Sequence, residues 1–412
     1  MLYFILRPLT RIALKAYFRR ITVNGLDHIP RDGAILLCSN HPTGFIEPCL
    51  LACFLPRTLH FLVRGDLFEK PVLKHVLIST NQIPIYRFRD GFKKLRDNQD
   101  VMSISYNKLA DGAAILIFPE ASTQEVKHLR PIKKGAARMA LDALKLHPDL
   151  DLKIIPIGIN YSKPNQWRSY VTINVGSPIS PTLPDEPKLV PQSTLKLTKE
   201  IQRGLSNQLL LLNEGVTQEK LDDALVLGQW ENRVKGSLWT KYDETEKFEQ
   251  ERRISEKLQA EDTLPTNLLS QLGTNFKRRI SVIDLLFALI ILIPVALILI
   301  LNSVPVLFGI FMRKKYVRER EFLASVTLAA SLGMYMILFP IALIISIVCF
   351  GYWGLLILFL PLLGMISLRG MDYIRSVWNK IKLNRNLGEA KISNIIEEGL
   401  RKLNEIRNTT LT

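Results

Sequence analysis

Two segments of this 412-residue sequence place histidine, carboxylate and basic side chains where they can act together on one substrate. In the first segment, His41 follows a short apolar run and Glu47 comes six residues later. An imidazole can take a proton from a hydroxyl group, and a carboxylate can orient the ring and stabilise the imidazolium that forms. The pair predicts general-base chemistry without a serine or cysteine nucleophile. A loop histidine taken alone is more often structural, so a second segment is needed.

The second segment is also a hydrophobic run that ends in polar residues. Its candidate site positions are Phe118, Pro119, Glu120 and Ser122. Bases and a glycine then precede the next helical pattern: Arg130, Lys133, Lys134 and Gly135. Two further bases, Arg64 and Arg87, follow other apolar runs. Bases beside the free backbone N–H groups at a helix start suit a phosphate, although each base taken singly is also typical of a solvated surface.

The elements that must position these residues alternate between residues 21 and 185. Strands are expected at 34–38, 59–63, 83–86, 113–118, 153–159 and 171–175. Helices are expected at 46–54, 71–79, 91–109 and 136–146. This alternation predicts an α/β domain, with a mixed, mostly parallel sheet flanked by helices. His41 and Glu120 would then both lie just beyond the ends of strands.

Taken in order, these segments resemble the motifs of the glycerolipid acyltransferase superfamily, which includes the glycerol-3-phosphate and lysophosphatidate acyltransferases. The matching motifs are Asn-His with a following acid (Asn40, His41, Glu47), an arginine after a strand (Arg87), Phe-Pro-Glu-Gly-x-Ser/Arg (Phe118, Pro119, Glu120, Ser122) and a strand around a proline (Ile155, Pro156, Ile157). The resemblance covers about residues 1 to 180. It implies an α/β acyltransferase domain.

The resemblance also implies roles for individual residues. His41 would deprotonate the acceptor hydroxyl, and Glu47 would orient His41. The acceptor would be held by a group of residues in which Arg87 binds its phosphate and Glu120 its hydroxyls: Arg87, Phe118, Pro119, Glu120, Ser122, Arg64, Lys134 and Gly135. The acyl donor would be acyl-CoA or acyl carrier protein, with no cofactor and no metal.

Two positions depart from the family pattern. The commonest family spacing puts an aspartate five residues after the histidine, at the position of Ile46, whereas Glu47 lies one residue further. The longer spacing resembles the glycerol-3-phosphate and dihydroxyacetone-phosphate branch, whose members also carry later membrane segments. The extra methylene of a glutamate is expected to loosen the ring's orientation, so that Glu47→Asp would preserve or raise activity. Ala121 replaces the usual glycine and would crowd a close backbone approach.

Composition directs attention to a membrane. Hydrophobic residues make up 48% of the chain, and the formal net charge is +16. No charge interrupts residues 285–312 or 322–368, and a crossing needs about 20 apolar residues. Pro294, Asn302, Ser303 and Pro305 predict a kink or re-entrant hairpin in the first stretch, and Gly351 a turn in the second. Because basic clusters flank both stretches, the positive-inside rule predicts two hairpins with both termini cytoplasmic.

The amino-terminal residues predict an amphipathic helix. Arg7, Arg11 and Lys15 recur every four residues beside a separate apolar face, which is typical of a helix in the membrane interface. The alternative is an amphipathic helix packed on its own domain. The expected organisation is therefore this surface helix (1–20), the catalytic domain (21–185), a polar helical connector (186–275), membrane helices in two hairpins (280–370) and a cytoplasmic helical tail (371–412).

Several classes of protein are excluded or disfavoured. The high hydrophobic content argues against disorder, and four cysteines without paired spacing argue against a disulfide scaffold or a zinc site. No Gly-rich loop with Lys-Ser/Thr is present, and the bases border apolar stretches, so neither nucleotide hydrolysis nor nucleic-acid binding is expected.

The favoured function is transfer of a fatty acyl group to glycerol 3-phosphate in phospholipid synthesis, with membrane lipids as further partners. Two alternatives stay open: lysophosphatidate or another membrane hydroxyl as acceptor, and a lipid-binding scaffold that has lost turnover. The expected location is a membrane with the catalytic domain on its cytoplasmic face, for which a bacterial inner membrane is the simplest choice. The sequence does not indicate an oligomeric state.

Overall fold

The computed structural model describes residues 2–85, 102–211 and 281–387, with a few positions between 241 and 253. The chain divides into two compact units, which are described separately. The first comprises Met1–Leu211, Thr240–Glu244 and Glu319–Ser325, and the second comprises the remaining segments of the chain.

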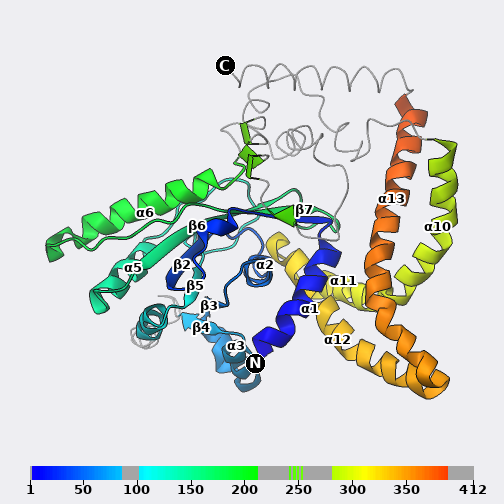
Figure 1. Cartoon of the computed structure of the whole chain (residues 1–412), viewed down its shortest axis with the longest axis horizontal. Coiled ribbons are helices and arrows are strands. Elements are labelled where there is room, and N and C mark those ends of the chain that lie inside the picture. Colours follow the sequence, from blue (N-terminus) through cyan, green and yellow to red (C-terminus); the bar gives the residue numbers. More distant parts are fainter. Residues whose placement is uncertain are drawn as a thin grey trace. The chain divides into compact units, whose positions relative to one another are not determined.

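The first unit is built on one sheet. Within the described residues, eight strands follow the order β4-β3-β5-β2-β6-β7-β1-β8 (Figure 1). Their bounds are Arg20–Asn24 (β1), Ala34–Ser39 (β2), Leu59–Arg64 (β3), Gln82–Ile85 (β4), Ala114–Ile117 (β5), Leu152–Tyr161 (β6), Tyr170–Val175 (β7) and Lys241–Tyr242 (β8). Neighbouring strands are parallel except for β6 and β7. The predicted mixed, mostly parallel sheet is therefore confirmed, while β1 and β8 were not predicted.

Helices cover both faces of this sheet. Their bounds are Leu2–Tyr17 (α1), Ile46–Phe54 (α2), Pro71–Ser79 (α3), Gly135–Leu146 (α5) and Val190–Asn207 (α6), and residues 102–110 are also helical. Helices α5 and α6 lie side by side on one face, and α1, α2 and α3 lie on the other (Figure 1). All six residues of β2 are buried, because alternate side chains of a strand point to opposite, equally covered faces.

Helix α6 belongs to this unit rather than to a separate connector. Leu197, Ile201 and Leu205 on α6 pack into the same core cluster as Leu36 of β2 and Met139 of α5. The unit continues to Leu211, beyond the boundary at residue 185 that the polar composition suggested. A polar stretch in which an apolar residue recurs every three or four positions is typical of an amphipathic helix that packs on a sheet.

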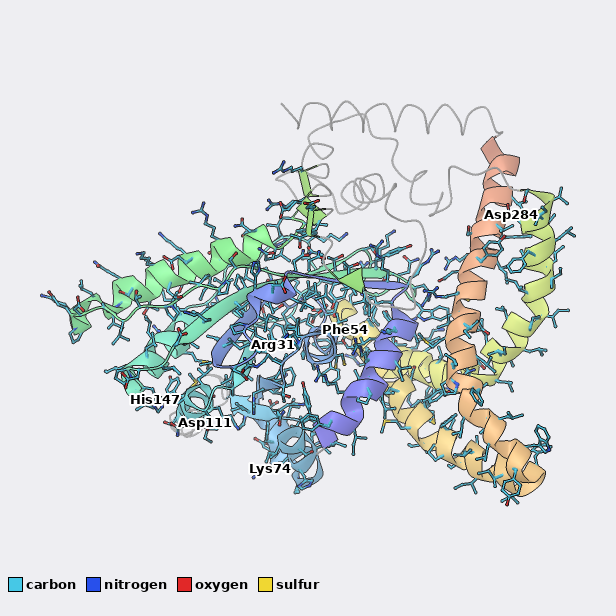
Figure 2. All side chains as sticks on the ribbon, in the orientation of Figure 1. Arg31, Phe54, Lys74, Asp111, His147 and Asp284 are labelled. Carbon is cyan, nitrogen blue, oxygen red and sulfur yellow. The ribbon has the colours of Figure 1, made fainter. Side chains whose placement is uncertain are left out.

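Helix α1 combines features of both interpretations of its sequence. Arg7 donates from Nη2 to the carbonyl oxygen of Leu55 at 2.8 Å, and the guanidinium of Arg11 lies 5.2 Å from the ring centre of Phe54, which is labelled in Figure 2. These bases thus contact the end of α2. Phe4 is 63% exposed and Ile12 is 49% exposed. The helix packs on its own domain and still presents an apolar stripe to its surroundings.

The second unit contains long apolar helices. Their bounds are Val282–Leu301 (α10), Ser303–Tyr316 (α11), Leu323–Phe350 (α12) and Leu360–Leu387 (α13), with a 3₁₀ segment over Gly351–Phe359 between the last two. In the part of the chain that the structure describes, Val282–Leu301 and Arg320–Trp378 are long and apolar enough to cross a membrane, by length and composition only. The breaks at Asn302 and Gly351 fall where the sequence predicts them.

Close contacts hold these helices together. Tyr373 on α13 donates to Asp284 at the start of α10 at 3.0 Å; Asp284 is labelled in Figure 2. Tyr335 on α12 donates to Asn302 at 3.1 Å. Gly309 on α11 lies so near the Thr327 carbonyl oxygen that an added Cβ would be 2.5 Å from it. Small residues and interhelical hydrogen bonds are typical contacts between helices in an apolar environment.

A stability prediction concerns Gly158 in β6. The carbonyl of Gln208, just after α6, is held over this glycine by donors from Asn160 and Asn174 at 2.8 and 3.0 Å. A Cβ at position 158 would lie 2.1 Å from that backbone oxygen. Gly158→Ala should therefore displace the end of α6 and lower the free energy of unfolding by about 2 kcal/mol.

Thermal unfolding of the purified protein measures this effect as a melting temperature several degrees lower. The matched control is Gly135→Ala in the first turn of α5, where an added Cβ would meet nothing within 4 Å. The control should unfold at the wild-type temperature or above it. Equal melting temperatures for the two variants would contradict the packing argument.

Candidate active site

The candidate site lies at the carboxyl ends of two adjacent parallel strands. Strand β2 ends at Ser39, two residues before His41, and β5 ends at Ile117, directly before Phe118. Because parallel neighbours end at the same edge of a sheet, the two candidate segments meet there. The rings of His41 and Phe118 are stacked, with their centres 3.9 Å apart and their planes at 12°.

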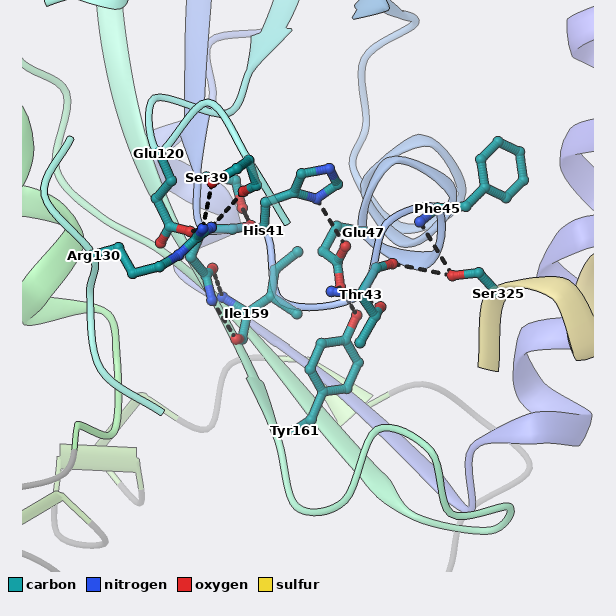
Figure 3. A network of polar contacts seen from close by, with 12 residues as sticks. Ser39, His41, Thr43, Phe45, Glu47, Glu120, Arg130, Ile159, Tyr161 and Ser325 are labelled. Atoms are coloured by element: carbon teal, nitrogen blue, oxygen red, sulfur yellow. Dashed lines mark hydrogen bonds and ion pairs between the residues drawn. The ribbon is translucent and has the colours of Figure 1, made fainter. Parts of the chain in front are cut away.

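Asn40 fixes the residue before the histidine. Its side-chain amide donates to the carbonyl oxygen of Ile159 at 3.0 Å and accepts from the N–H of the same residue at 2.8 Å (Figure 3). This pair of hydrogen bonds ties the loop after β2 to the backbone of β6. His41 thus follows a residue that is tied to β6, and its ring is stacked on Phe118, so the freedom of the ring to rotate is small.

Glu47 is fully buried in the first turn of α2 and faces His41. One carboxylate oxygen lies 3.0 Å from Nδ1 of His41. The other accepts from the N–H of Thr43 at 3.0 Å, from the Thr43 hydroxyl at 2.5 Å and from the Tyr161 hydroxyl at 2.8 Å. Burial raises the pKa of Tyr161 well above its usual value, so the phenol keeps its proton and donates. These donors offset the cost of burying the carboxylate.

The arrangement defines the chemistry available to His41. A carboxylate can only accept, so Nδ1 carries the proton and the other ring nitrogen, Nε2, is the basic one. The side chain of His41 is 16% exposed, which leaves the ring accessible to a substrate. A glutamate was expected to orient the imidazole ring loosely. The structure does not show this looseness, because both carboxylate oxygens of Glu47 form hydrogen bonds.

A second polar cluster surrounds Glu120. The guanidinium of Arg130 contacts its carboxylate and the backbone oxygen of Ser122, and donates to the Ser122 hydroxyl at 2.6 Å (Figure 3). Burial raises the pKa of Glu120, while the Arg130 charge and the His41 backbone N–H oppose that shift. This cluster therefore combines a guanidinium, a carboxylate and a hydroxyl close to the backbone of His41.

The loop that carries this cluster returns to the start of α5. The N–H of Lys133 donates to the carbonyl oxygen of Pro119 at 2.7 Å. This contact places Lys134 and Gly135, where α5 begins, beside the Phe118–Ser122 segment. Ala121 adopts a left-handed backbone conformation, with φ of 59°, which explains why a glycine suits this position.

Two basic residues predicted to belong to the site, Arg64 and Arg87, are not found there among the described residues. Arg64 ends β3, two strands away from β2, and its half-exposed guanidinium pairs with Asp66 in its own loop at 2.5 Å. Arg87 lies outside the described residues. The structure thus brings together His41, Glu47, Phe118, Glu120 and Ser122, and it places the start of α5 nearby.

Sequence reasoning missed two of the residues that surround Glu47. Thr43 lies between His41 and Glu47, but its spacing predicts no role for it, and Tyr161 lies 114 residues from its partner. The sequence places Arg130 among bases that suit a phosphate and does not predict its contact with Glu120. Tyr161 ends a strand that pairs with β2, so only the sheet order, which no local pattern carries, connects it to Glu47.

Comparisons with known proteins find relatives of part of this chain. Residues 20–160 match the family model described as Acyltransferase. An uncharacterized acyltransferase of Schizosaccharomyces pombe is 41% identical over 73 residues, which are 18% of this chain and 11% of that protein. Glycerol-3-phosphate O-acyltransferase 1 of Saccharomyces cerevisiae is 40% identical over 74 residues, 18% of this chain and 10% of that protein.

Glycerol-3-phosphate O-acyltransferase 2 of the same yeast is 32% identical over 83 residues, 20% of this chain and 11% of that protein. The matched segments therefore span only about a tenth of these relatives' lengths. A crystal structure of the 1-acyl-sn-glycerophosphate acyltransferase PlsC from Thermotoga maritima is similar over 48% of this chain and 78% of that one, with 15% identity. The TM-score of this match is 0.35.

The Glu120 cluster yields a prediction about stability. The side chains of Arg130 and Glu120 are 12% and 5% exposed, and removing one partner of such a buried pair costs about 3 kcal/mol. Arg130→Gln should therefore lower the free energy of unfolding by about that amount in denaturant titrations. Arg64→Gln is the matched control, because Arg64 and Asp66 are 56% and 38% exposed and such pairs contribute less than about 1 kcal/mol.

The loss in Arg130→Gln should also depend on pH. Without the guanidinium, burial raises the pKa of Glu120 further, and an acid with a raised folded-state pKa loses stability as pH rises above its ordinary range. The difference from wild type should therefore be larger at about pH 7 than at about pH 4. A difference that is independent of pH, or equal to that of Arg64→Gln, would contradict this account.

Proposed function

We propose that this protein is an O-acyltransferase that transfers a fatty acyl group from acyl-CoA or acyl carrier protein to glycerol 3-phosphate. The observation that carries the proposal is the His41–Glu47 pair just after β2, with a histidine side chain that is 16% exposed. The match of residues 20–160 to the acyltransferase family supports the reaction class.

In the proposed reaction, Nε2 of His41 takes the proton of the acceptor hydroxyl while the hydroxyl oxygen attacks the thioester carbonyl carbon. Glu47 holds the ring and stabilises the imidazolium that forms. The carbon–sulfur bond then breaks, an ester is left on the acceptor, and the departing thiolate receives a proton as the free thiol. Each acyl transfer thus restores the neutral imidazole without a covalent enzyme intermediate.

The phosphate of the acceptor needs a cation near His41. Arg130 is a candidate for this cation. Its guanidinium contacts the carboxylate of Glu120, which in turn accepts a hydrogen bond from the backbone of His41. Arg87 is proposed from the family resemblance to share it, with Lys134 and Gly135 beside them at the start of α5. Glu120 and Ser122 would position the hydroxyl groups of the glycerol.

Glycerol 3-phosphate is the favoured acceptor for two reasons. Two of the relatives bear that acceptor in their names, and the His-to-acid spacing of six resembles the same branch. Lysophosphatidate is the second candidate. A scaffold without turnover is less well supported, because the geometry of Glu47 is intact in spite of its departure from the family's aspartate.

We also propose membrane attachment through α10 and the α12–α13 segment, with the catalytic unit on the cytoplasmic face. The support is that only 11% and 6% of their most apolar stretches are buried within the structure, so apolar side chains need another environment. The curated relatives are fungal, so the bacterial inner membrane expected from the sequence gains no support from them.

The general-base role is tested with His41→Ala. Membranes containing the wild-type chain should convert labelled acyl-CoA and glycerol 3-phosphate to lysophosphatidate, and His41→Ala should lower this rate by about 10³-fold or more, with unchanged protein level and melting temperature. Product from lysophosphatidate alone would instead favour the second acceptor. Absence of product from every acceptor, with either donor, would favour the scaffold and sink the proposal.

The role of Glu47 is tested by shortening it. The aspartate of Glu47→Asp reaches less far by one methylene, so it cannot keep both the His41 contact and the three bonds from Thr43 and Tyr161. This reverses the expectation from the family spacing. We expect kcat about 10-fold lower with little change in KM, since a displaced base costs rate more than affinity. A rate at or above wild type would show that the extra methylene is dispensable.

A further inference from the structure

The first residues of α12 are attached to the catalytic unit. The segment Glu319–Ser325 belongs to the same compact unit as the sheet. Asn165, in the loop between β6 and β7, accepts from the N–H of Ala324 at 3.1 Å and donates to the carbonyl oxygen of Arg320 at 3.0 Å. Glu125 pairs with the Arg320 side chain at 3.2 Å. One N–H group in the first turn of α12 is thus satisfied by a side chain of the catalytic unit.

Ser325 reaches from this segment to the loop that carries His41. Its hydroxyl accepts from the N–H of Phe45 at 3.2 Å and donates to the carbonyl oxygen of Thr43 at 3.1 Å (Figure 3). Ser325 is 3% exposed, so water does not compete effectively for these groups. One hydroxyl therefore satisfies two backbone groups of a loop that lies about 280 residues away in the chain.

The ring of Phe322 packs against the same loop. Gly44, between the two backbone groups that Ser325 binds, has φ of +26°, and an added Cβ would lie 2.4 Å from the Phe322 ring. A glycine is needed there because the ring occupies the space of a side chain. The loop between His41 and Glu47 is thus bounded by two hydrogen bonds from the first turn of α12 and by an aromatic contact from the residue just before it.

The contacts continue to the candidate base. Ser325 holds the backbone of Thr43, Thr43 donates twice to one oxygen of Glu47, and the other oxygen of Glu47 holds Nδ1 of His41. We propose that Ser325 is a positioning residue for acyl transfer: by fixing the Thr43–Phe45 loop, it orients Glu47 and through it His41. This inference rests on the proposed function, because it concerns the geometry of the same base.

Ser325 lies at the start of a long apolar helix, so its contact links that helix to the loop of His41. Helix α12 runs without interruption from Leu323 to Phe350 and forms part of the segment that is apolar enough to cross a membrane. The same helix therefore begins at the loop of the base and continues as an apolar segment. Correct orientation of His41 requires this helix as well as the α/β domain.

The experiment compares Ser325→Ala with wild type in the full-length chain, using labelled acyl-CoA and glycerol 3-phosphate. Alanine is the better helix former, so the change does not weaken α12 itself. We expect kcat about 10-fold lower with KM for both substrates within about 2-fold of wild type. Ser303→Ala is the matched control: the Ser303 hydroxyl bonds only locally to Ile300, and its removal should leave kcat unchanged.

A double variant separates positioning from a general loss of structure. Ser325→Ala and Glu47→Asp both act on the orientation of the imidazole, so their effects on kcat should not multiply. We expect the double variant to lose about 20-fold, whereas independent effects would give about 100-fold. Melting temperatures of all variants are measured beside the rates.

The outcomes are distinct. An unchanged kcat in Ser325→Ala, a loss seen only in KM, or fully multiplicative effects would overturn the positioning role while leaving the acyltransferase function intact. A wild-type chain that acylates no acceptor would overturn the proposed function itself. A lower kcat with unchanged KM and a sub-multiplicative double variant is the result expected from the structure.

Discussion

The buried carboxylate of Glu47 is the interaction on which the candidate site depends. An ion without exposed surface is tolerated only where donors surround it. For Glu47 on α2, His41 and Thr43 supply them from the loop after β2, and Tyr161 supplies one from β6. Each donor fixes the element from which it comes. The requirement to satisfy one charge therefore aligns three parts of the chain, and His41 acquires its orientation as a result.

The order of the strands explains why these parts meet. Strand β2 lies between β5 and β6, and all three run parallel, so the loops that follow them gather at one edge. The loop after β2 carries His41, the loop after β5 carries Glu120, and β6 carries Ile159 and Tyr161. The antiparallel pairing of β6 with β7 lets β6 extend beyond β2, which brings Tyr161 up to Glu47.

Much of this arrangement was predictable from local patterns. Strands buried on both faces appear as continuous apolar runs, so β2, β5 and β6 were located within two residues, and polar residues directly after such runs pointed to His41 and Glu120. The tight geometry of Glu47 was not predictable, because spacing alone suggests a looser fit for the longer acid. Tyr161 and Ser325 carry no local signal: each reaches the site through tertiary contacts, and a lone serine at the start of an apolar helix is unremarkable in sequence.

The basic residues near the apolar segments have more than one kind of contact. Bases and apolar stretches first indicated attachment to a membrane, yet Arg7 and Arg11 of α1 also contact the end of α2, and Arg320, at the border of the second apolar stretch, pairs with Glu125. Residues at the edges of apolar segments thus bind the catalytic unit as well. A charge beside an apolar helix is suited to both tasks, because its partner can be either a headgroup or a carboxylate of the neighbouring domain. The border of the second apolar stretch therefore binds the unit that carries the candidate site, and its Ser325 holds the loop of His41.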